Sequence, residues 1–287
     1  MRLIVVDGSV GAWKSSALKY LHQNMDTDGL VLSQEPVKNY EKLTLPSGKQ
    51  INCLRSFYNS IGNPEKRELA SLQMQMVALA TLARQYAHLK YLSSDNRFYI
   101  MERGLHSVEV FTHTQYKLNY LSETSYAIIQ MMHKQLALTA PEPELIFLLT
   151  ASPRTLMRRI SRRQRPSEQN LKMQYLQELS HSYMTLLGPK AIVMPPCNDS
   201  RTVAEKIYAL ITLYRTNMTH QDLQAIALTE QCHWGLLKNP VRNSRTLAAE
   251  EDSSKEKTSG LRDRRVTFDL SKLKLESSPP TPCPAQK

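Results

Sequence analysis

The chain has 287 residues, of which 41% are hydrophobic and 22% are charged, so a wholly disordered chain is excluded and a folded α/β domain with insertions or a tail is favoured. Nine glycines and 15 prolines exclude collagen-like and glycine-rich repetitive chains. The formal net charge of +11 indicates a polyanionic partner, namely a phosphate group, a nucleic acid or a membrane surface.

Short and continuously apolar runs predict five buried strands, at residues 3–6, 30–32, 98–101, 145–149 and 191–194. Helical periodicity predicts helices over residues 15–22, 65–92, 122–136, 154–163, 170–187 and 201–215. In the longest of these helices, the predicted buried stripe contains Leu69, Leu72, Met76, Leu79, Ala80 and Ala83. The alternation predicts an α/β fold in which a parallel five-stranded sheet carries helices on both faces.

Large apolar residues become scarce after Lys238. This change of composition predicts a folded domain over residues 1–238 and a disordered C-terminal tail over residues 239–287.

Cellular location is indicated by the cysteines and by the N-terminus. The four cysteines are scattered without a Cys-x-x-Cys pair, so neither a disulfide framework nor a zinc site is expected. The first apolar run ends at Asp7, which is too early for a signal peptide, and no transit peptide or membrane span is predicted. We expect a cytoplasmic protein, with a nuclear location as the alternative, and no membrane partner.

A phosphate-binding loop follows the first predicted strand. Gly8, Lys14 and Ser15 match the pattern G-x-x-x-x-G-K-[ST] between a strand and a helix. Backbone N–H groups of such a loop bind phosphate oxygens, while Lys14 neutralises phosphate charge and Ser15 ligates Mg²⁺. The expected ATP-binding residues are Gly8, Ser9, Val10, Gly11, Ala12, Trp13, Lys14, Ser15 and Ser16.

Trp13 departs from this pattern, which has glycine before the lysine. Glycine reaches backbone conformations that other residues avoid, and it keeps side-chain bulk away from the phosphates. An indole here either points away from the nucleotide or obstructs it, so catalytic activity depends on the direction that Trp13 takes.

Further motifs follow the loop in the order typical of one family. They are Glu-Pro-Val at residues 35–37, Met-Glu-Arg at residues 101–103 and Tyr-Leu-Gln-Glu-Leu at residues 175–179. Together with the P-loop, they resemble the deoxynucleoside kinases, which include thymidine kinase 2-like and insect multisubstrate enzymes, from about residue 2 to about residue 211. The resemblance implies a P-loop nucleoside-kinase fold, a homodimer, and Mg²⁺- and ATP-dependent phosphorylation of a deoxynucleoside 5′-hydroxyl in nucleotide salvage, with a pyrimidine such as thymidine favoured.

The resemblance also assigns roles to side chains near the strand ends. Glu35 is the expected general base, which takes the proton of the 5′-hydroxyl. Arg103 is expected to bind the 5′-oxygen region and the transferring phosphate, and Glu102 to assist Mg²⁺. Gln73 is expected to pair with the base edge because an amide both donates and accepts hydrogen bonds, with Gln75 as the alternative. The other expected substrate contacts are Tyr40 with the base, Tyr58 and Glu168 with the sugar 3′-hydroxyl, and Val108 and Thr112 in the base pocket.

A basic segment over residues 153–172 contains seven lysine or arginine residues and one acidic residue, and thus more than half of the net charge. It joins a helix to a Pro166-Ser167 turn, as a lid over phosphates would. Arg163 and Arg165 are expected to stabilise charge on the moving phosphoryl group, with Arg159 as a further candidate.

Other functions stay open at this point. A thymidylate kinase is the near alternative, although that family follows its Glu-Pro with Gly-Gly where this chain has Val37-Lys38. A catalytically weakened family member with a binding or regulatory role is motivated by Trp13 and by residues 265–268 (Arg265 to Phe268), which resemble a docking motif for protein phosphatase 1. Nucleic-acid binding is not expected, because the charge lies in the lid and no nucleic-acid-binding module is recognisable.

Overall fold

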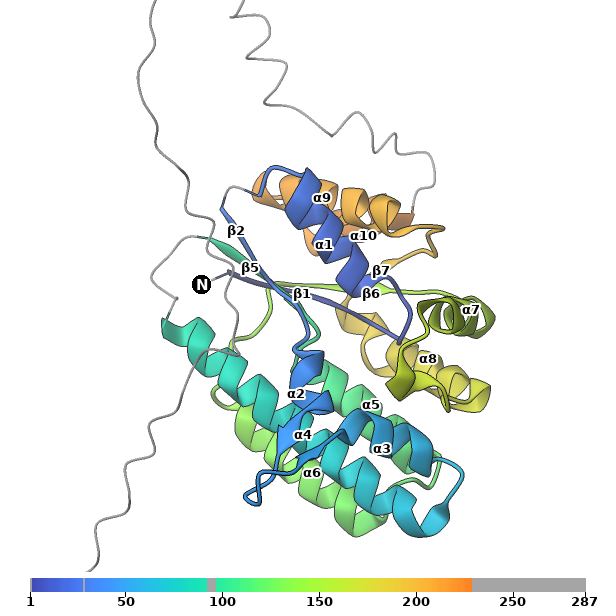
Figure 1. Cartoon of the computed structure of the whole chain (residues 1–287). Coiled ribbons are helices and arrows are strands. Elements are labelled where there is room, and N and C mark those ends of the chain that lie inside the picture. Colours follow the sequence, from blue (N-terminus) through green and yellow to red (C-terminus); the bar gives the residue numbers. More distant parts are fainter. Residues whose placement is uncertain (1, 28, 92–96, 229–287) are drawn as a thin grey trace, which may run out of the picture. The chain divides into compact units, whose positions relative to one another are not determined.

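The computed structural model describes residues 2–27, 29–91 and 97–228 (Figure 1). The predicted tail, the domain boundary expected after residue 238 and the phosphatase-docking motif at residues 265–268 lie outside the described residues. Within the described ranges, no helix combines the length and the apolar character that crossing a membrane requires.

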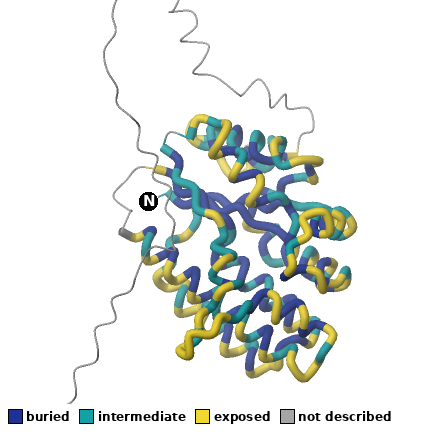
Figure 2. Tube along the Cα trace, viewed as in Figure 1, coloured by how far each residue is buried: buried dark blue, intermediate teal, exposed yellow. Residues whose placement is uncertain are grey.

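Five parallel strands form the centre of the fold. They are β1 (Arg2–Gly8), β2 (Leu30–Ser33), β5 (Phe98–Glu102), β6 (Leu145–Leu149) and β7 (Ile192–Met194), in the spatial order β2-β5-β1-β6-β7. Strands β5 and β6 are buried along their whole length, and Figure 2 shows the sheet as the buried layer of the molecule. Continuous apolar runs are typical of strands that are covered on both faces, so the predicted α/β class and its five strands are confirmed.

Helices cover both faces of this sheet. Figure 1 shows α1 (Lys14–Asn24), α9 (Ser200–Arg215) and α10 (His220–Leu228) on one face. The other face carries α4 (Pro64–Tyr91), α5 (Leu105–Lys117), α6 (Glu123–Ala137) and α8 (Met173–Leu186). All six predicted helices are present with ends shifted by a few residues.

Two regions give the site its walls. The segment after β2 forms α2 (Val37–Glu41), an antiparallel hairpin of β3 (Leu43–Thr44) and β4 (Gln50–Ile51), and α3 (Cys53–Ser60), where the sequence predicted only a polar loop. The basic segment forms α7 (Pro153–Arg163), followed by a short turn η1 (Pro166–Glu168), and a second such turn η2 (Gly188–Lys190) precedes β7. Helix α7 begins where Ser152 Oγ accepts a hydrogen bond from the backbone N–H of Thr155, with Pro153 in the first turn.

The predicted buried stripe of α4 is correct in part, because Leu79 is buried and Leu72 and Met76 pack against the core. Leu69 is 60% exposed, and Ala80 and Ala83 are exposed as well. The face that packs inward carries polar side chains, among them Ser71 and Gln75, beside apolar ones such as Leu79 and Leu82. Hydrophobic periodicity assigns such polar residues to the solvent-exposed face of a helix. Here Gln75 lines an internal cavity instead, and the periodicity of the sequence does not predict a cavity.

Candidate active site

A cavity of about 490 Å³ opens at the carboxyl ends of β1, β2 and β5. In open α/β sheets this edge is where ligands bind. The walls come from the P-loop, the segment after β2, helices α3, α4 and α5, and the basic segment. Of the sequence-predicted site residues, all but Gly8, Ser9, Gln73 and Thr112 are among those that line the cavity.

Lys14 lies folded into its own loop. Its Nζ donates hydrogen bonds to the carbonyl oxygens of Gly8, at 3.0 Å, and Ser9, at 2.9 Å. Burial and the neighbouring Arg103 lower the pKa of Lys14 to about 8. The loop also needs its first glycine, because Gly8 has φ 140° and an added Cβ would lie 2.4 Å from the carbonyl oxygen of Leu149. Gly8 and Ser9 thus shape the loop and hold the lysine through their backbones.

Trp13 takes a left-handed backbone conformation, of the kind that glycine adopts readily. Its φ of 71° lies in the left-handed region, which disfavours residues that have a Cβ. The indole lines the cavity, and the guanidinium of Arg159 lies 4.8 Å from the ring centroid. Arg159 also donates a hydrogen bond to the carbonyl oxygen of Gly11, at 3.4 Å. The tryptophan is therefore on the cavity side of the loop, stacked between the loop and α7.

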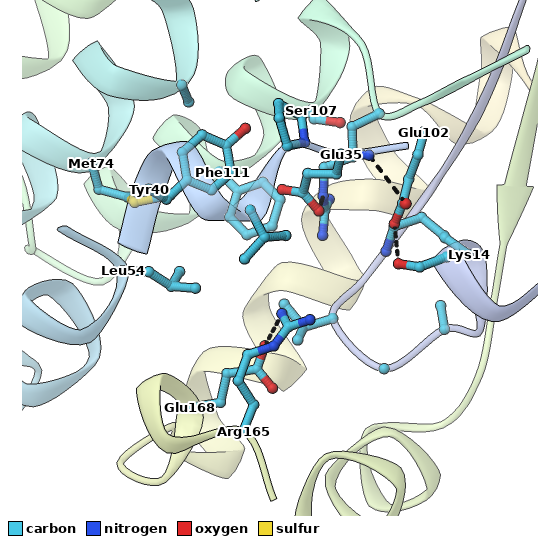
Figure 3. Close-up of a pocket in the computed structure, with 18 of the residues that line it drawn as sticks. Lys14, Glu35, Tyr40, Leu54, Met74, Glu102, Ser107, Phe111, Arg165 and Glu168 are labelled. Carbon is cyan, nitrogen blue, oxygen red and sulfur yellow. Dashed lines mark hydrogen bonds and ion pairs between the residues drawn. The ribbon is translucent and has the colours of Figure 1, made fainter. Parts of the chain in front are cut away.

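Two carboxylates and an arginine meet beside the loop. Arg103 Nε donates to Glu35 Oε2 at 2.9 Å, and the backbone N–H of Glu35 donates to Glu102 Oε2 at 3.3 Å. Burial and the neighbouring Glu35 raise the pKa of Glu102. Figure 3 shows Glu35 between the aromatic side chains of Tyr40 and Phe111 on one side and Lys14 with Glu102 on the other. The predicted base therefore borders both the phosphate loop and the apolar part of the cavity.

Oxygen ligands for a magnesium ion are also present here. Ser15 Oγ donates to Glu102 Oε1 at 2.7 Å, so a hydroxyl and a carboxylate meet at the start of α1. Mg²⁺ prefers such oxygen donors and is usually held by one or two protein groups together with substrate phosphates. Among the described residues, no group of three or more His, Cys, Asp or Glu side chains could hold a metal ion. The pair therefore fits a Mg²⁺ ion that is shared with a bound phosphate.

Arg103 is supported by residues that the sequence analysis missed. Its Nη1 donates to the Tyr183 hydroxyl at 2.8 Å and lies 3.5 Å from Asp7 Oδ1, while its own φ is 64°. The Asp7 side chain is fully buried and accepts hydrogen bonds from Tyr183, at 2.8 Å, and Ser107, at 2.5 Å. The signal in the sequence was a carboxylate at the end of a buried strand, next to a P-loop. Asp7 and Tyr183 thus hold the guanidinium of Arg103, whose backbone lies in the left-handed region, in place.

The basic segment carries an internal clamp. Arg163 forms an ion pair with Glu168 Oε2, and Arg165 Nη1 lies 3.0 Å from Glu168 Oε1. The Glu168 side chain is buried. Ser167 in the same turn donates to Glu41 of α2 at 2.9 Å. Both arginines lie at the cavity, as the sequence predicted, and Glu168 holds them there.

The apolar part of the cavity contains Tyr40, Tyr58 and Val108 as expected. Gln73 is exposed, so its expected place in the pocket is wrong, whereas Gln75 is 3% exposed and lines the cavity. A helix turns by 100° per residue, which puts positions two apart on different sides of α4. Thr112 is buried, but it is not among the lining residues. The sequence analysis missed further lining residues, among them Leu54, Met74, Ala78, Leu82, Phe111 and Gln115.

Comparisons with known proteins agree with this geometry. The sequence model of the deoxynucleoside kinase family matches residues 4–221. Deoxycytidine kinase of Homo sapiens is 27% identical over 205 residues, which cover 65% of this chain and 75% of that protein. Deoxycytidine kinase 1 of Xenopus laevis is 26% identical over 211 residues, which cover 67% and 76%. A solved deoxyadenosine kinase from M. mycoides, with the products dCMP and a flexible dCDP bound, matches with a TM-score of 0.58 at 20% identity and covers 75% of this chain and 100% of that chain.

Proposed function

The chain belongs to the deoxynucleoside kinase family, and from this premise we propose that it transfers the γ-phosphoryl group of ATP to the 5′-hydroxyl of a deoxynucleoside. A pyrimidine nucleoside such as thymidine is the proposed acceptor, and nucleotide salvage is the proposed setting. The observation that carries the proposal is the Glu35–Arg103 pair, which borders both the P-loop and the apolar part of one cavity.

Glu35 supports this chemistry as the general base. A base has to lie within hydrogen-bond reach of the proton it removes, and the Glu35 carboxylate lines the cavity. Arg103, held at 2.9 Å from Glu35 Oε2, is placed to bind the attacking oxygen and the transferring phosphate. The 5′-oxygen forms the new bond to the γ-phosphorus, the bond from the γ-phosphorus to ADP breaks, and the hydroxyl proton passes to Glu35.

Positive charge around the phosphate end supports the second part of the reaction. Lys14 on one side and Arg163 and Arg165 on the other line the cavity. Phosphoryl transfer is accelerated mainly by positioning and by stabilising charge on the phosphoryl oxygens, which is the proposed role of these three side chains. Ser15 and Glu102 would hold a Mg²⁺ ion, which supplies further positive charge to the phosphates when bound.

The base end of the cavity supports a neutral heterocycle. None of the described residues of α4 and α5 that line it is charged, and Gln75 offers both a donor and an acceptor. Leu82 and Val108 add apolar surface of the kind that packs against a thymine methyl group. We therefore propose that Gln75 pairs with the base edge while the apolar side chains favour a pyrimidine.

The test is an acceptor panel. Purified protein with ATP and Mg²⁺ is given each of the four deoxynucleosides and, separately, thymidine monophosphate, and nucleotide products are quantified. We expect 5′-monophosphate from at least one pyrimidine deoxynucleoside and no diphosphate from thymidine monophosphate. Product only from thymidine monophosphate would replace the proposal with a thymidylate kinase.

A weakened family member that acts as a binding or regulatory protein is the second candidate, and the conformation of Trp13 motivates it. The indole occupies cavity surface in the phosphate loop. In that case the same panel gives no turnover, while the deoxynucleoside still raises the melting temperature of the protein by mass action.

Gln75→Ala is expected to raise the KM for the preferred deoxynucleoside by about tenfold, since a buried partner of the base is lost. Gln73→Ala is the matched control, because this neighbouring glutamine of α4 is exposed. It is expected to leave KM and kcat unchanged. Steady-state kinetics with varied nucleoside measure both variants, and an effect of Gln73→Ala that equals that of Gln75→Ala would refute the assignment.

A further inference from the structure

Gln115 is a buried amide whose hydrogen-bonding capacity is unused. It lies on α5, is 0% exposed and lines the cavity. Neither its Nε2 nor its Oε1 has a hydrogen-bond partner among the described residues. Buried side-chain polar atoms nearly always have a partner, and leaving one without costs free energy, so each exception requires an explanation.

Its place along α5 points to the base end of the cavity. Val108, Phe111 and Gln115 all line the cavity and follow each other at spacings of three and four residues, which is one face of a helix. Ser107, which also lines it, bonds to Asp7 beside the P-loop. At 1.5 Å per residue, Gln115 lies about 12 Å further along the helix axis than Ser107. It is therefore distant from the reacting phosphate.

A second polar group without a partner lies next to this amide. The Tyr175 hydroxyl is buried and forms no hydrogen bond of ordinary geometry within the described part of the chain. Burial raises the pKa of Tyr175, and the adjacent Gln115 amide lowers it by a smaller amount. The Tyr175 ring packs against Phe57 and Tyr58, whose centroids lie 5.6 and 6.4 Å away. The Gln115 amide in the cavity wall and the Tyr175 hydroxyl next to it are therefore two buried polar groups that no hydrogen bond of ordinary geometry satisfies within the described residues.

We propose that Gln115 is a second base-reading residue, whose amide pairs with a carbonyl or amino group of the nucleobase that Gln75 leaves unpaired. The Tyr175 hydroxyl interacts with the amide from a position that does not line the cavity. A neutral heterocycle with polar groups on more than one edge satisfies both glutamines at once. The inference deepens the proposed function and depends on it, because it names the residue that selects among deoxynucleosides.

Gln115→Met tests the proposal, because methionine keeps the length of the side chain and removes the amide. We expect the KM for the preferred deoxynucleoside to rise about tenfold with kcat changed by less than about threefold, because the contact is far from the phosphate. The melting temperature of the ligand-free variant is expected to stay equal or to rise, because an unpaired buried amide is lost. The preference ratio between pyrimidine deoxynucleosides is expected to shrink.

Thr112→Val is the matched control. Thr112 lies one turn earlier on α5, is 0% exposed and also has an unpartnered hydroxyl, but it does not line the cavity. The Thr112→Val variant is expected to have a melting temperature equal to or higher than that of the wild type, and an unchanged KM for the deoxynucleoside. Gln115→Leu repeats the test with a second apolar side chain.

Three outcomes would overturn the proposal. An unchanged KM for every deoxynucleoside in Gln115→Met and Gln115→Leu would remove the base-reading role alone, with turnover by the wild type leaving the proposed function intact. A lower melting temperature, or failure of both variants to fold, would mean that the amide stabilises the protein itself. A wild type that neither binds nor phosphorylates any deoxynucleoside would refute the proposed function and this inference together.

Discussion

Replacing Glu35 with glutamine is expected to lower kcat by about 10²- to 10⁴-fold, the usual contribution of a general base. Glutamine has nearly the same size, and its amide oxygen can still accept the hydrogen bond from Arg103 Nε, which is 2.9 Å long in the wild type. It cannot take the proton of a 5′-hydroxyl at neutral pH. Substrate binding is therefore expected to persist while turnover is lost, and steady-state kinetics with a nucleoside-induced thermal shift measure the two separately.

Glu41→Gln is the control for Glu35→Gln. Glu41 is another carboxylate of the segment after β2, accepts a hydrogen bond from Ser167 and does not line the cavity. The Glu41→Gln variant is expected to keep kcat within about threefold of the wild type, because the Glu41 side chain touches no reacting atom. A loss of nucleoside binding that accompanies the loss of turnover in Glu35→Gln would instead indicate that Glu35 mainly holds Arg103 in place.

The sheet could be predicted because each strand carries its own signal. A parallel strand that is covered on both faces has to be apolar at every position, and β5 and β6 are buried at every residue. Residues at the ends of these strands then meet at one edge, which is how Glu35, Glu102 and Arg103 come together in the cavity. The apolar pattern of each strand was sufficient here, because Glu35, Glu102 and Arg103 lie at or directly after the ends of the strands that it predicts.

The base end of the cavity could not be predicted in the same way. Helix α4 buries Ser71, Gln75 and Gln85 toward the inside, while Leu69 is exposed. A hydrophobic pattern assumes that the interior is apolar, and it therefore fails where the interior is a binding cavity. The choice of Gln73 over Gln75 came from the family resemblance, and it was wrong because Gln75, not Gln73, lies on the inward face of α4.

The support of Arg103 was missed for a different reason. Asp7 and Tyr183 lie 176 positions apart in the chain, and nothing local in either segment indicates their 2.8 Å hydrogen bond. Only the fold brings the end of β1 and the end of α8 together around one guanidinium. Long-range pairs of this kind need coordinates, even where the residues on both sides belong to recognisable motifs.

Trp13→Gly is expected to lower the KM for ATP by about tenfold and to raise kcat/KM accordingly. The indole lines the cavity at the phosphate loop and stacks with the guanidinium of Arg159, whose centre lies 4.8 Å from the ring centroid. Removing it clears space next to the backbone N–H groups that are proposed to bind phosphate, while Arg159 keeps its hydrogen bonds to the carbonyl oxygens of Gly11 and Cys197. A tenfold change corresponds to about 1.4 kcal/mol of binding free energy.

Trp13→Ala separates the bulk of the indole from the strain of its backbone. Both variants remove the ring, so both are expected to lower the KM for ATP. Only glycine also relieves the left-handed conformation at φ 71°, so Trp13→Gly is expected to be more stable than Trp13→Ala by about 1 kcal/mol in denaturant unfolding. A raised KM for ATP in both variants would contradict the expected obstruction, because the indole would then contribute to nucleotide binding.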